Sequence, residues 1–324
     1  MSRALHWHKR ILVALVMASA AMRADAAAGG QDAARAIKLP APARLGGAPD
    51  AAYAAYQQGY YREAMREAVK RVDADPGDGP AMTLIGELYA RGLGVRRDPA
   101  EAARWYQLAA GRSDPQAAFA LALAKLRGEG VAKDPAGAAQ LLEQAAAQNH
   151  PGALYNLGLL ALEGDEKTKN FSKAAQLFRK AAELDNSDAA YALGLLYKSG
   201  SGVEQSDADA AHWIGRAAKD GHVPAEVEYA IMLFNGTGVE KDETAAAKLF
   251  LKAAAANNPV AQNRLARILA AGRGLPRDMV EAMKWHLLAK AAGIKDDWLD
   301  GELAKMPPEE KAAAEQRFRH YAGY

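Results

Sequence analysis

Alanine recurs every 36 residues through the middle of the chain, and the residues around it keep the same step. The recurring alanines are Ala81, Ala117, Ala153, Ala189, Ala225 and Ala261. In the first unit, Leu84, Ile85, Leu88 and Tyr89 follow at the spacing that places apolar side chains on one face of a helix. A repeat of this length predicts a solenoid, because each unit can bury its apolar face only by stacking on its neighbours.

Glycines and helix caps divide each unit into two predicted helices. A glycine eleven residues after the alanine can take the left-handed conformation that ends a helix. These glycines are Gly92, Gly128, Gly164, Gly200, Gly236 and Gly272. Six residues later stands a side chain that can accept hydrogen bonds from the free amides of a second helix. These cap candidates are Asp98, Asp134, Asn170, Ser206, Asp242 and Asp278.

The second helix of the first five units carries two adjacent alanines and then a pair of large side chains, which favours close helix packing, and the sixth unit has Trp285-His286 at the place of the large pair. This whole pattern resembles the Sel-one-like repeat (SLR) family, a branch of the tetratricopeptide-like (TPR-like) solenoids. The first unit matches the family at Ala81, Ile85-Gly86, Tyr89, Gly92, Gly94-Val95, Asp98, Ala102, Trp105-Tyr106 and Ala109-Ala110. The resemblance implies an all-α fold, a right-handed α/α superhelical solenoid of paired antiparallel helices. Unit 153–188 departs from the family at residues 165–169, where we expect a local bend.

The segments outside the repeats have their own signatures. Residues 1–26 combine a basic start, an apolar run and a small-x-small site at their end, which is typical of a cleaved signal peptide. An uncleaved anchor is the alternative. Residues 27–48 are rich in Ala, Gly and Pro and predict a flexible linker. Residues 49–80 resemble a TPR-like helix pair, residues 81–296 form the six repeats, and residues 297–324 predict polar capping helices.

Composition narrows the possible functions and partners. The chain has no cysteine, which excludes disulfides and thiol catalysis. Of its 41 basic and 39 acidic residues, four and one respectively lie in 1–26, so the remainder carries 37 and 38. This balance does not favour a nucleic-acid partner. Beyond the leader, no apolar run is long enough to span a bilayer, so we expect a periplasmic protein whose mature chain does not insert into a membrane.

The sequence offers no catalytic, cofactor-binding or metal-binding residues. The five histidines outside the leader include no pair at helical i, i+3 or i+4 spacing, and the repeats contain no serine nucleophile motif. His150 and His222 stand after their units' second helices, where we expect solvated C-terminal caps. Arg96-Arg97 and Lys133, set against Glu226 and Glu228, suggest an uneven potential, although a solvated charged face is the simpler account.

The candidate binding residues lie two positions after the recurring alanines. Phe119, Tyr155 and Tyr191 occupy this position in three successive units, and first helices line the concave face of such solenoids. Aromatic anchors in a groove are typical of protein recognition. An aromatic residue at this position can equally be ordinary repeat packing, because the resembled family often has tyrosine there.

The most direct interpretation is a non-catalytic adaptor. The resemblance implies partners in envelope regulation or assembly, so we expect an envelope or periplasmic-facing membrane protein on the concave face, and no cofactor. The alternative is a protein that binds or hydrolyses cell-wall material (peptidoglycan or β-lactams), as suggested for cysteine-rich relatives. This chain lacks their cysteines.

Overall fold

The computed structural model describes residues 50–163 and 169–323. Outside these residues lie the predicted leader (1–26) and the predicted linker (27–48). The irregular turn at 165–169 also lies outside them, except for Lys169. Within them the protein is all helical, with sixteen helices and no strand. This confirms the all-α solenoid of paired helices. The described residues up to Leu184 and those from Asp185 onward form two compact parts of the chain, called unit 1 and unit 2 below, each of which contains several 36-residue repeats.

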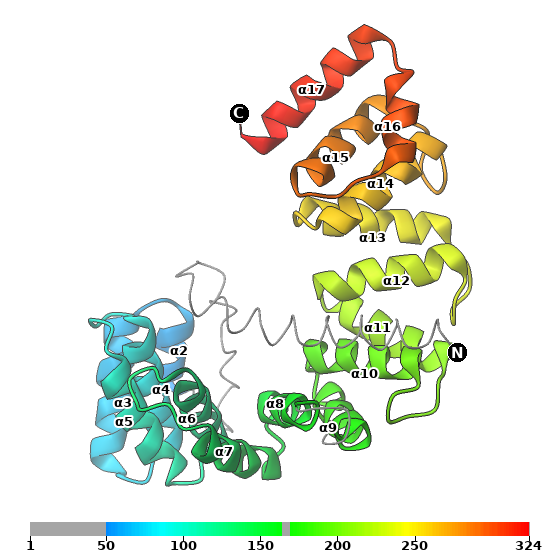
Figure 1. Ribbon diagram of the computed structural model, residues 1–324. Coiled ribbons are helices and arrows are strands. Elements are labelled where there is room, and N and C mark those ends of the chain that lie inside the picture. The colour runs from blue at the N-terminus through cyan, green and yellow to red at the C-terminus, as the bar shows by residue number, and fades with distance from the viewer. Residues whose placement is uncertain (1–49, 164–168, 324) are drawn as a thin grey trace. The chain divides into compact units, whose positions relative to one another are not determined.

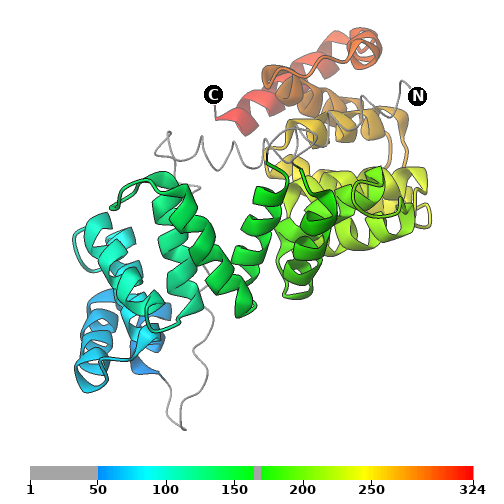
Figure 2. The same ribbon diagram turned by 60° about the horizontal axis from the view of Figure 1, so that its bottom comes forward.

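Unit 1 contains four helix pairs, and unit 2 contains three helix pairs followed by two C-terminal helices, the second of which packs on the last pair (Figures 1 and 2). The helices of unit 1 are α2 (Ala51–Gln57), α3 (Tyr61–Ala74), α4 (Gly79–Arg91), α5 (Pro99–Ala110), α6 (Pro115–Arg127), α7 (Pro135–Ala147), α8 (Pro151–Ala161) and α9 (Phe171–Glu183). Those of unit 2 are α10 (Ser187–Ser199), α11 (Asp207–Lys219), α12 (Val223–Asn235), α13 (Glu243–Ala255), α14 (Pro259–Ala271), α15 (Met279–Ala291), α16 (Asp297–Ala304) and α17 (Pro308–Ala322). Inside each unit the helices pack in chain order, each pair on the next.

The predicted caps of the second helices are confirmed. All six side chains accept a backbone hydrogen bond from the first turn of their helix, as Asp98 Oδ1 does from the amides of Ala100 and Glu101 at 3.0 Å each. The stop glycines are also confirmed where they are described. Gly92, Gly128, Gly200, Gly236 and Gly272 all end their helices in the left-handed conformation. Helix α8 differs, because it ends earlier, at Ala161.

A second series of caps, which the sequence analysis did not identify, starts the first helices. These residues are Asp78, Asp114, His150, Asn186, His222 and Asn258. Each accepts a hydrogen bond, 2.7–3.1 Å long, from the amide of the recurring alanine three residues later. The alanines themselves are at most 1% exposed. The recurring alanine is therefore the point where a buried helix start meets its cap.

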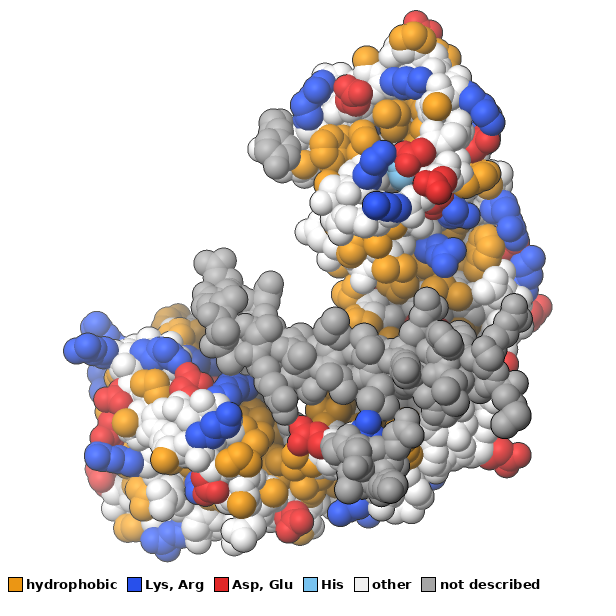
Figure 3. Space-filling view, in the orientation of Figure 1, with side chains coloured by type: hydrophobic (Ala, Val, Ile, Leu, Met, Phe, Trp, Pro, Cys, Tyr) orange, Lys and Arg blue, Asp and Glu red, His pale blue; other side chains and the backbone are white. Residues whose placement is uncertain are grey.

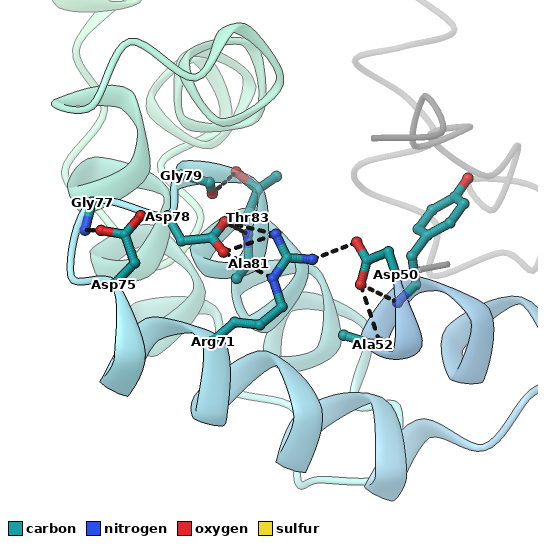
Figure 4. Close-up of polar contacts among 10 residues, drawn as sticks. Asp50, Ala52, Arg71, Asp75, Gly77, Asp78, Gly79, Ala81 and Thr83 are labelled. Carbon is teal, nitrogen blue, oxygen red and sulfur yellow. Dashed lines mark hydrogen bonds and ion pairs between the residues drawn. The ribbon is translucent and has the colours of Figure 1, made fainter. Parts of the chain in front are cut away.

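The first of these caps also ties the N-terminal helix pair to the repeats (Figure 4). Arg71 of α3 donates to both carboxylate oxygens of Asp78, at 2.8 and 2.9 Å, and its other terminal nitrogen contacts Asp50, the cap of α2. A bidentate arginine–carboxylate pair fixes orientation as well as distance. One guanidinium thus sets the register between α2, α3 and α4.

A second glycine lies two residues after the stop glycine, in the turn between the two helices of a repeat, as Gly238 does after Gly236. Its left-handed backbone conformation favours glycine, and the space around it excludes a side chain. A Cβ atom at Gly238 would lie 1.9 Å from the carbonyl oxygen of Asp207, at the start of the preceding second helix. A Cβ atom at Gly130 would lie 2.0 Å from the carbonyl oxygen of Pro99, and one at Gly274 would lie 2.2 Å from that of Glu243. The turns therefore rest directly on the backbone of the neighbouring repeat.

The core of each repeat lies between its two helices. It holds the paired alanines, which are buried except for the half-buried Ala139, and the second member of each large pair, which is buried in all six repeats. These large residues are Tyr106, Leu142, Phe178, Ile214, Phe250 and His286. At the C-terminal end, α17 covers α15, where the Lys284 ammonium lies 4.1 Å from the ring centroid of Trp285 and 5.3 Å from that of Tyr321.

The contact between Gly158 of α8 and Phe178 of α9 gives a stability prediction. A Cβ at Gly158 would lie 2.5 Å from Phe178 Cε1, and the Phe178 ring is held on another side by Tyr155, with ring centroids 5.6 Å apart. We expect Gly158→Ala to lower the free energy of unfolding by about 1–3 kcal/mol. Thermal and denaturant unfolding followed by circular dichroism would measure it.

The control uses a pair that the chain already contains. Ala122 and Leu142 occupy the same two positions in the repeat before. The double variant G158A/F178L reproduces that pair. Its loss in free energy of unfolding should therefore be smaller than the sum of the losses of the two single variants, by about 0.5–3 kcal/mol. Strictly additive losses would contradict the steric explanation.

Candidate protein-interaction surface

The first helices present the residues that the sequence analysis selected for partner binding. Phe119 lies on α6 and Tyr155 on α8, both in unit 1, whereas Tyr191 lies on α10 in unit 2. Phe119 and Tyr191 are half-buried, and Tyr155 is only 7% exposed. The prediction that the three act as one partner-binding ridge therefore stays a prediction, and packing accounts for a large part of each ring.

Phe119 and Tyr191 make the same contact in different repeats. The Phe119 ring stacks on the imidazole of His150 with centroids 4.5 Å apart, and the Tyr191 ring lies 4.8 Å from that of His222. Each histidine caps the next first helix along the chain. Burial and the nearby Glu228 carboxylate raise the pKa of Tyr191 to about 12, so its hydroxyl remains neutral. Each aromatic side chain is thus held against a helix start.

The interpretation of His150 and His222 as solvated C-terminal caps was wrong. Both are N-terminal caps of the following helix, and their Nδ1 atoms accept from the amides of Ala153 and Ala225 at 3.1 Å each. An Nδ1 that accepts a hydrogen bond carries no proton, so the proton lies on Nε2. In His150 this Nε2–H donates to Gln116 Oε1 at 2.9 Å. Burial lowers the pKa of His150 to about 4.

The charges that suggested an uneven potential are largely engaged. Arg97 Nε donates to the carbonyl of Ala90 at 3.0 Å, which caps the end of α4, and the Arg97 guanidinium also pairs with Glu129 of the next turn. Glu228 pairs with Lys198 of α10, and the buried Glu226 pairs with Lys252 at 2.5 Å. Arg97, Glu226 and Glu228 thus join neighbouring helices and turns, whereas Arg96 and Lys133 are exposed.

Polar contacts continue along the first helices of unit 2. Asp296, the cap of α16, accepts from Asn263 at 2.7 Å and from two nitrogens of Arg267 at 2.6 and 2.7 Å. Burial opposes ionisation of this carboxyl, yet the hydrogen bonds from Arg267 and Asn263 hold its pKa at about 2. Arg267 also covers the ring of Trp298, at 5.2 Å, and Trp298 is 43% exposed. The first-helix face of unit 2 therefore ends on an exposed aromatic ring.

Side chains of the types that bind metal ions are dispersed over the described residues. Across residues 50–163 and 169–323, no three His, Asp or Glu side chains gather closely enough to hold a metal ion. The one buried histidine–carboxylate contact of α15 joins His286 Nε2 to Asp300 Oδ1 at 2.8 Å and belongs to the packing of α16. Within the same ranges, every helix is too short or too polar to cross a bilayer.

The capping role of His150 predicts a pH-dependent stability. Between about pH 6.5, its ordinary pKa, and about pH 4 the unfolded chain binds a proton at this histidine and the folded chain does not. The stabilisation is therefore complete above pH 6.5 and is lost as the pH falls towards 4, by an amount of order 3 kcal/mol. Urea unfolding at a series of pH values would measure it.

The matched variant is His150→Asn, because Asn186 and Asn258 occupy the same cap position in other repeats. Asparagine keeps the cap but does not titrate, so the loss of stability between pH 6.5 and 4 should be smaller in H150N than in the wild type. Equal slopes in the two proteins would show that His150 is not the titrating group.

Comparisons with known proteins agree with this geometry. A family model described as the Sel1 repeat matches residues 79–114, 115–150, 151–186, 187–222, 223–258 and 259–294. Each match begins at the first residue of a first helix, directly after its cap. No curated protein gives a significant match.

Two solved structures are similar to this chain. A Sel1 repeat protein from Oxalobacter formigenes is 28% identical, with a TM-score of 0.63, and the alignment covers 77% of this chain and 100% of that one. A protective antigen present in uropathogenic Escherichia coli strains, which displays an SLR fold, is 27% identical with a TM-score of 0.53, covering 85% of this chain and 68% of that one. Because six matched repeats follow one another without a gap from residue 79 to residue 294, the chain belongs to the Sel1 repeat family.

Proposed function

We propose that this protein is an exported, non-catalytic adaptor that binds an envelope or periplasmic-facing membrane protein through its first-helix surface. Sel1 repeat solenoids are scaffolds suited to protein–protein interaction. The observation that carries the proposal is the immobilised aromatic ring at Phe119 and Tyr191. Both rings pack against a cap histidine, Phe119 stacked and Tyr191 tilted, and both remain half-exposed.

Such rings suit recognition for an energetic reason. A side chain that binding immobilises costs about 0.5–1.5 kcal/mol of conformational entropy, and a side chain that is already fixed avoids most of this cost. Aromatic residues also supply much of the binding energy at protein interfaces. The repeat packing that holds Phe119 and Tyr191 therefore supports a binding role for their exposed edges as well as a structural role.

Partner binding can be tested with substitutions taken from the chain itself. Thr83 and Val227 occupy the positions equivalent to Phe119 and Tyr191 in other repeats, so F119T/Y191V replaces both rings with residues that the fold accepts. Residues 27–324 would capture partners from an envelope extract, and a purified captured protein would be titrated by calorimetry. We expect the variant to bind it at least about tenfold more weakly, a loss of about 1.4 kcal/mol.

Leu108→Ala is the control, because Leu108 is 54% exposed on the second helix α5. This variant should bind as the wild type does, and all proteins should give the same helical circular dichroism spectrum. Unchanged binding by a folded F119T/Y191V would overturn the site assignment. Hydrolysis of nitrocefin, or saturable binding of peptidoglycan with no protein partner, would instead support the cell-wall alternative.

Export can be tested separately. If residues 1–26 are a cleaved signal peptide, the protein expressed in a Gram-negative host should appear in the osmotic-shock fraction with Ala27 as its first residue, by intact-mass spectrometry. Changing Arg3, Lys9 and Arg10 to glutamate should keep the full-length chain inside the cell. A wild-type chain that retains Met1 and remains in the cytoplasmic or membrane fraction would contradict export to the periplasm.

A further inference from the structure

Unit 2 contains an open hollow on the side of its second helices. It lies between α11, α12 and the turn that follows α12, with a volume of about 320 Å³. Its lining residues are Ala208, Ala211, His212, Gly215, Tyr229, Gly238 and Val239. Four of them lie on the second helix α11 and Tyr229 lies on the first helix α12, so the hollow does not include Phe119 or Tyr191. Figure 1 shows α11 and α12 next to one another. Figure 3, a space-filling view in the same orientation, shows basic and acidic side chains interspersed over the C-terminal helices.

The hollow arises where the chain departs from its own repeat. The position of Gly215 holds Gln107 in the first regular repeat, and that of Tyr229 holds Leu121 in the repeat after it. A Cβ at Gly215 would lie 2.9 Å from Tyr229 Cε2, so the tyrosine ring lies directly on the glycine. Glycine inside a helix costs about 1 kcal/mol relative to alanine. Here the glycine lets the aromatic ring of Tyr229 approach the backbone of α11.

A second aromatic group borders the hollow. His212 is exposed, and its ring lies 5.1 Å from that of Trp213 in an edge-on arrangement at 84°. The other lining residues on α11 are Ala208, Ala211 and Gly215, whose side chains are small or absent. A depression lined by aromatic rings and small residues fits an apolar side chain of a partner, as the anchor pockets of protein interfaces do.

Acidic residues flank the lining of the hollow along the chain. Asp207 directly precedes the lining residue Ala208, Glu240 directly follows the lining residue Val239, and Glu204 lies in the turn that leads into α11. All three are exposed, and none of them makes an ion pair with any other described residue. The turn at Gly238 rests on the backbone of Asp207. The nearby cations are engaged elsewhere, Arg216 with Asp185 at 2.6 Å and Lys241 with Glu243 at 2.9 Å.

These acidic residues are specific to unit 2. The positions of Glu204, Asp207 and Glu240 hold Arg96, Pro99 and Ala132 in the first regular repeats. Three uncompensated carboxylates that flank the lining of a hollow attract cations, and the attraction is screened as salt rises. The charge therefore indicates a basic partner.

We propose that the hollow is a docking site for a basic segment of a partner protein, which inserts one apolar side chain between Tyr229 and His212. Lysine or arginine residues on either side of that anchor pair with Glu204, Asp207 and Glu240. The site is independent of Phe119 and Tyr191, so the two surfaces can be tested apart.

The test begins with a random peptide library displayed on phage and panned on residues 27–324. We expect enrichment of peptides with a leucine, isoleucine or phenylalanine flanked by lysine or arginine. A synthetic enriched peptide should bind at micromolar Kd in fluorescence anisotropy, and at least about fivefold more weakly at about 500 mM than at about 50 mM NaCl. A library that gives no binder, or gives acidic peptides, would overturn the proposal.

Two variants copied from other repeats locate the binding. G215Q/Y229L restores the pair Gln107 and Leu121 and fills the hollow, so it should lose peptide binding by at least about tenfold while keeping its helical spectrum. E204R/E240A copies Arg96 and Ala132, and it should lose most of the salt dependence.

F119T/Y191V is the matched control and should bind the peptide as the wild type does, whether or not it still binds an envelope protein. Unchanged peptide binding by folded G215Q/Y229L would show that the peptide binds elsewhere and would overturn the assignment.

Discussion

The start of each first helix is the constraint on which the solenoid depends. There the amide of a fully buried alanine must find an acceptor, since water cannot reach it and an unpaired buried amide costs about 1–3 kcal/mol. The cap three residues earlier supplies that acceptor, and the same cap is the point of contact with the preceding repeat. Arg71 holds Asp78, Gln116 holds His150, and Tyr191 packs against His222. Helix capping and repeat stacking are therefore one interaction.

This coupling explains why the first-helix cap, three residues before the recurring alanine, is not the same residue in every repeat. Aspartate, asparagine and histidine all offer one acceptor to the alanine amide, and each brings a different remaining surface to the neighbour. Aspartate suits a guanidinium, as Asp78 shows with Arg71. Neutral histidine suits an aromatic face, as His150 shows with Phe119. The side chain selected at the cap thus sets the character of the first-helix surface beside it.

Function on such a scaffold resides where a repeat departs from the common plan, because the shared residues are occupied by capping, turning and packing. Two departures are visible in the described chain. The aromatic residues Phe119 and Tyr191 pair with cap histidines, on the first-helix side. Gly215 and Tyr229 replace a longer side chain and a leucine, and unpaired carboxylates flank the lining of their hollow along the chain. The two proposed surfaces use different helices, so they do not share residues.

Much of the fold could be predicted from spacing alone. The 36-residue step, the stop glycines and the second-helix caps such as Asp98 are local features, whose effect depends on the few residues around them. The first-helix caps were missed because the repeat was divided at the alanine three residues later. Each cap residue was therefore assigned to the end of the preceding repeat, although four of the six are Asp or Asn. The burial of Tyr155 against Phe178 could not be predicted either, since that contact joins residues on different helices.

By itself, therefore, the sequence determined the helices, their order and their stacking into repeats, because caps, turns and apolar spacing act over short distances along the chain. Only the tertiary structure decided which charged and aromatic groups remain available. Arg97, Glu226 and Glu228 look alike as free charges in a sequence, yet each is engaged by a residue of another helix or turn. Glu204, Asp207 and Glu240 are not. Availability depends on neighbours brought close by stacking, and that distance exists only in the folded chain.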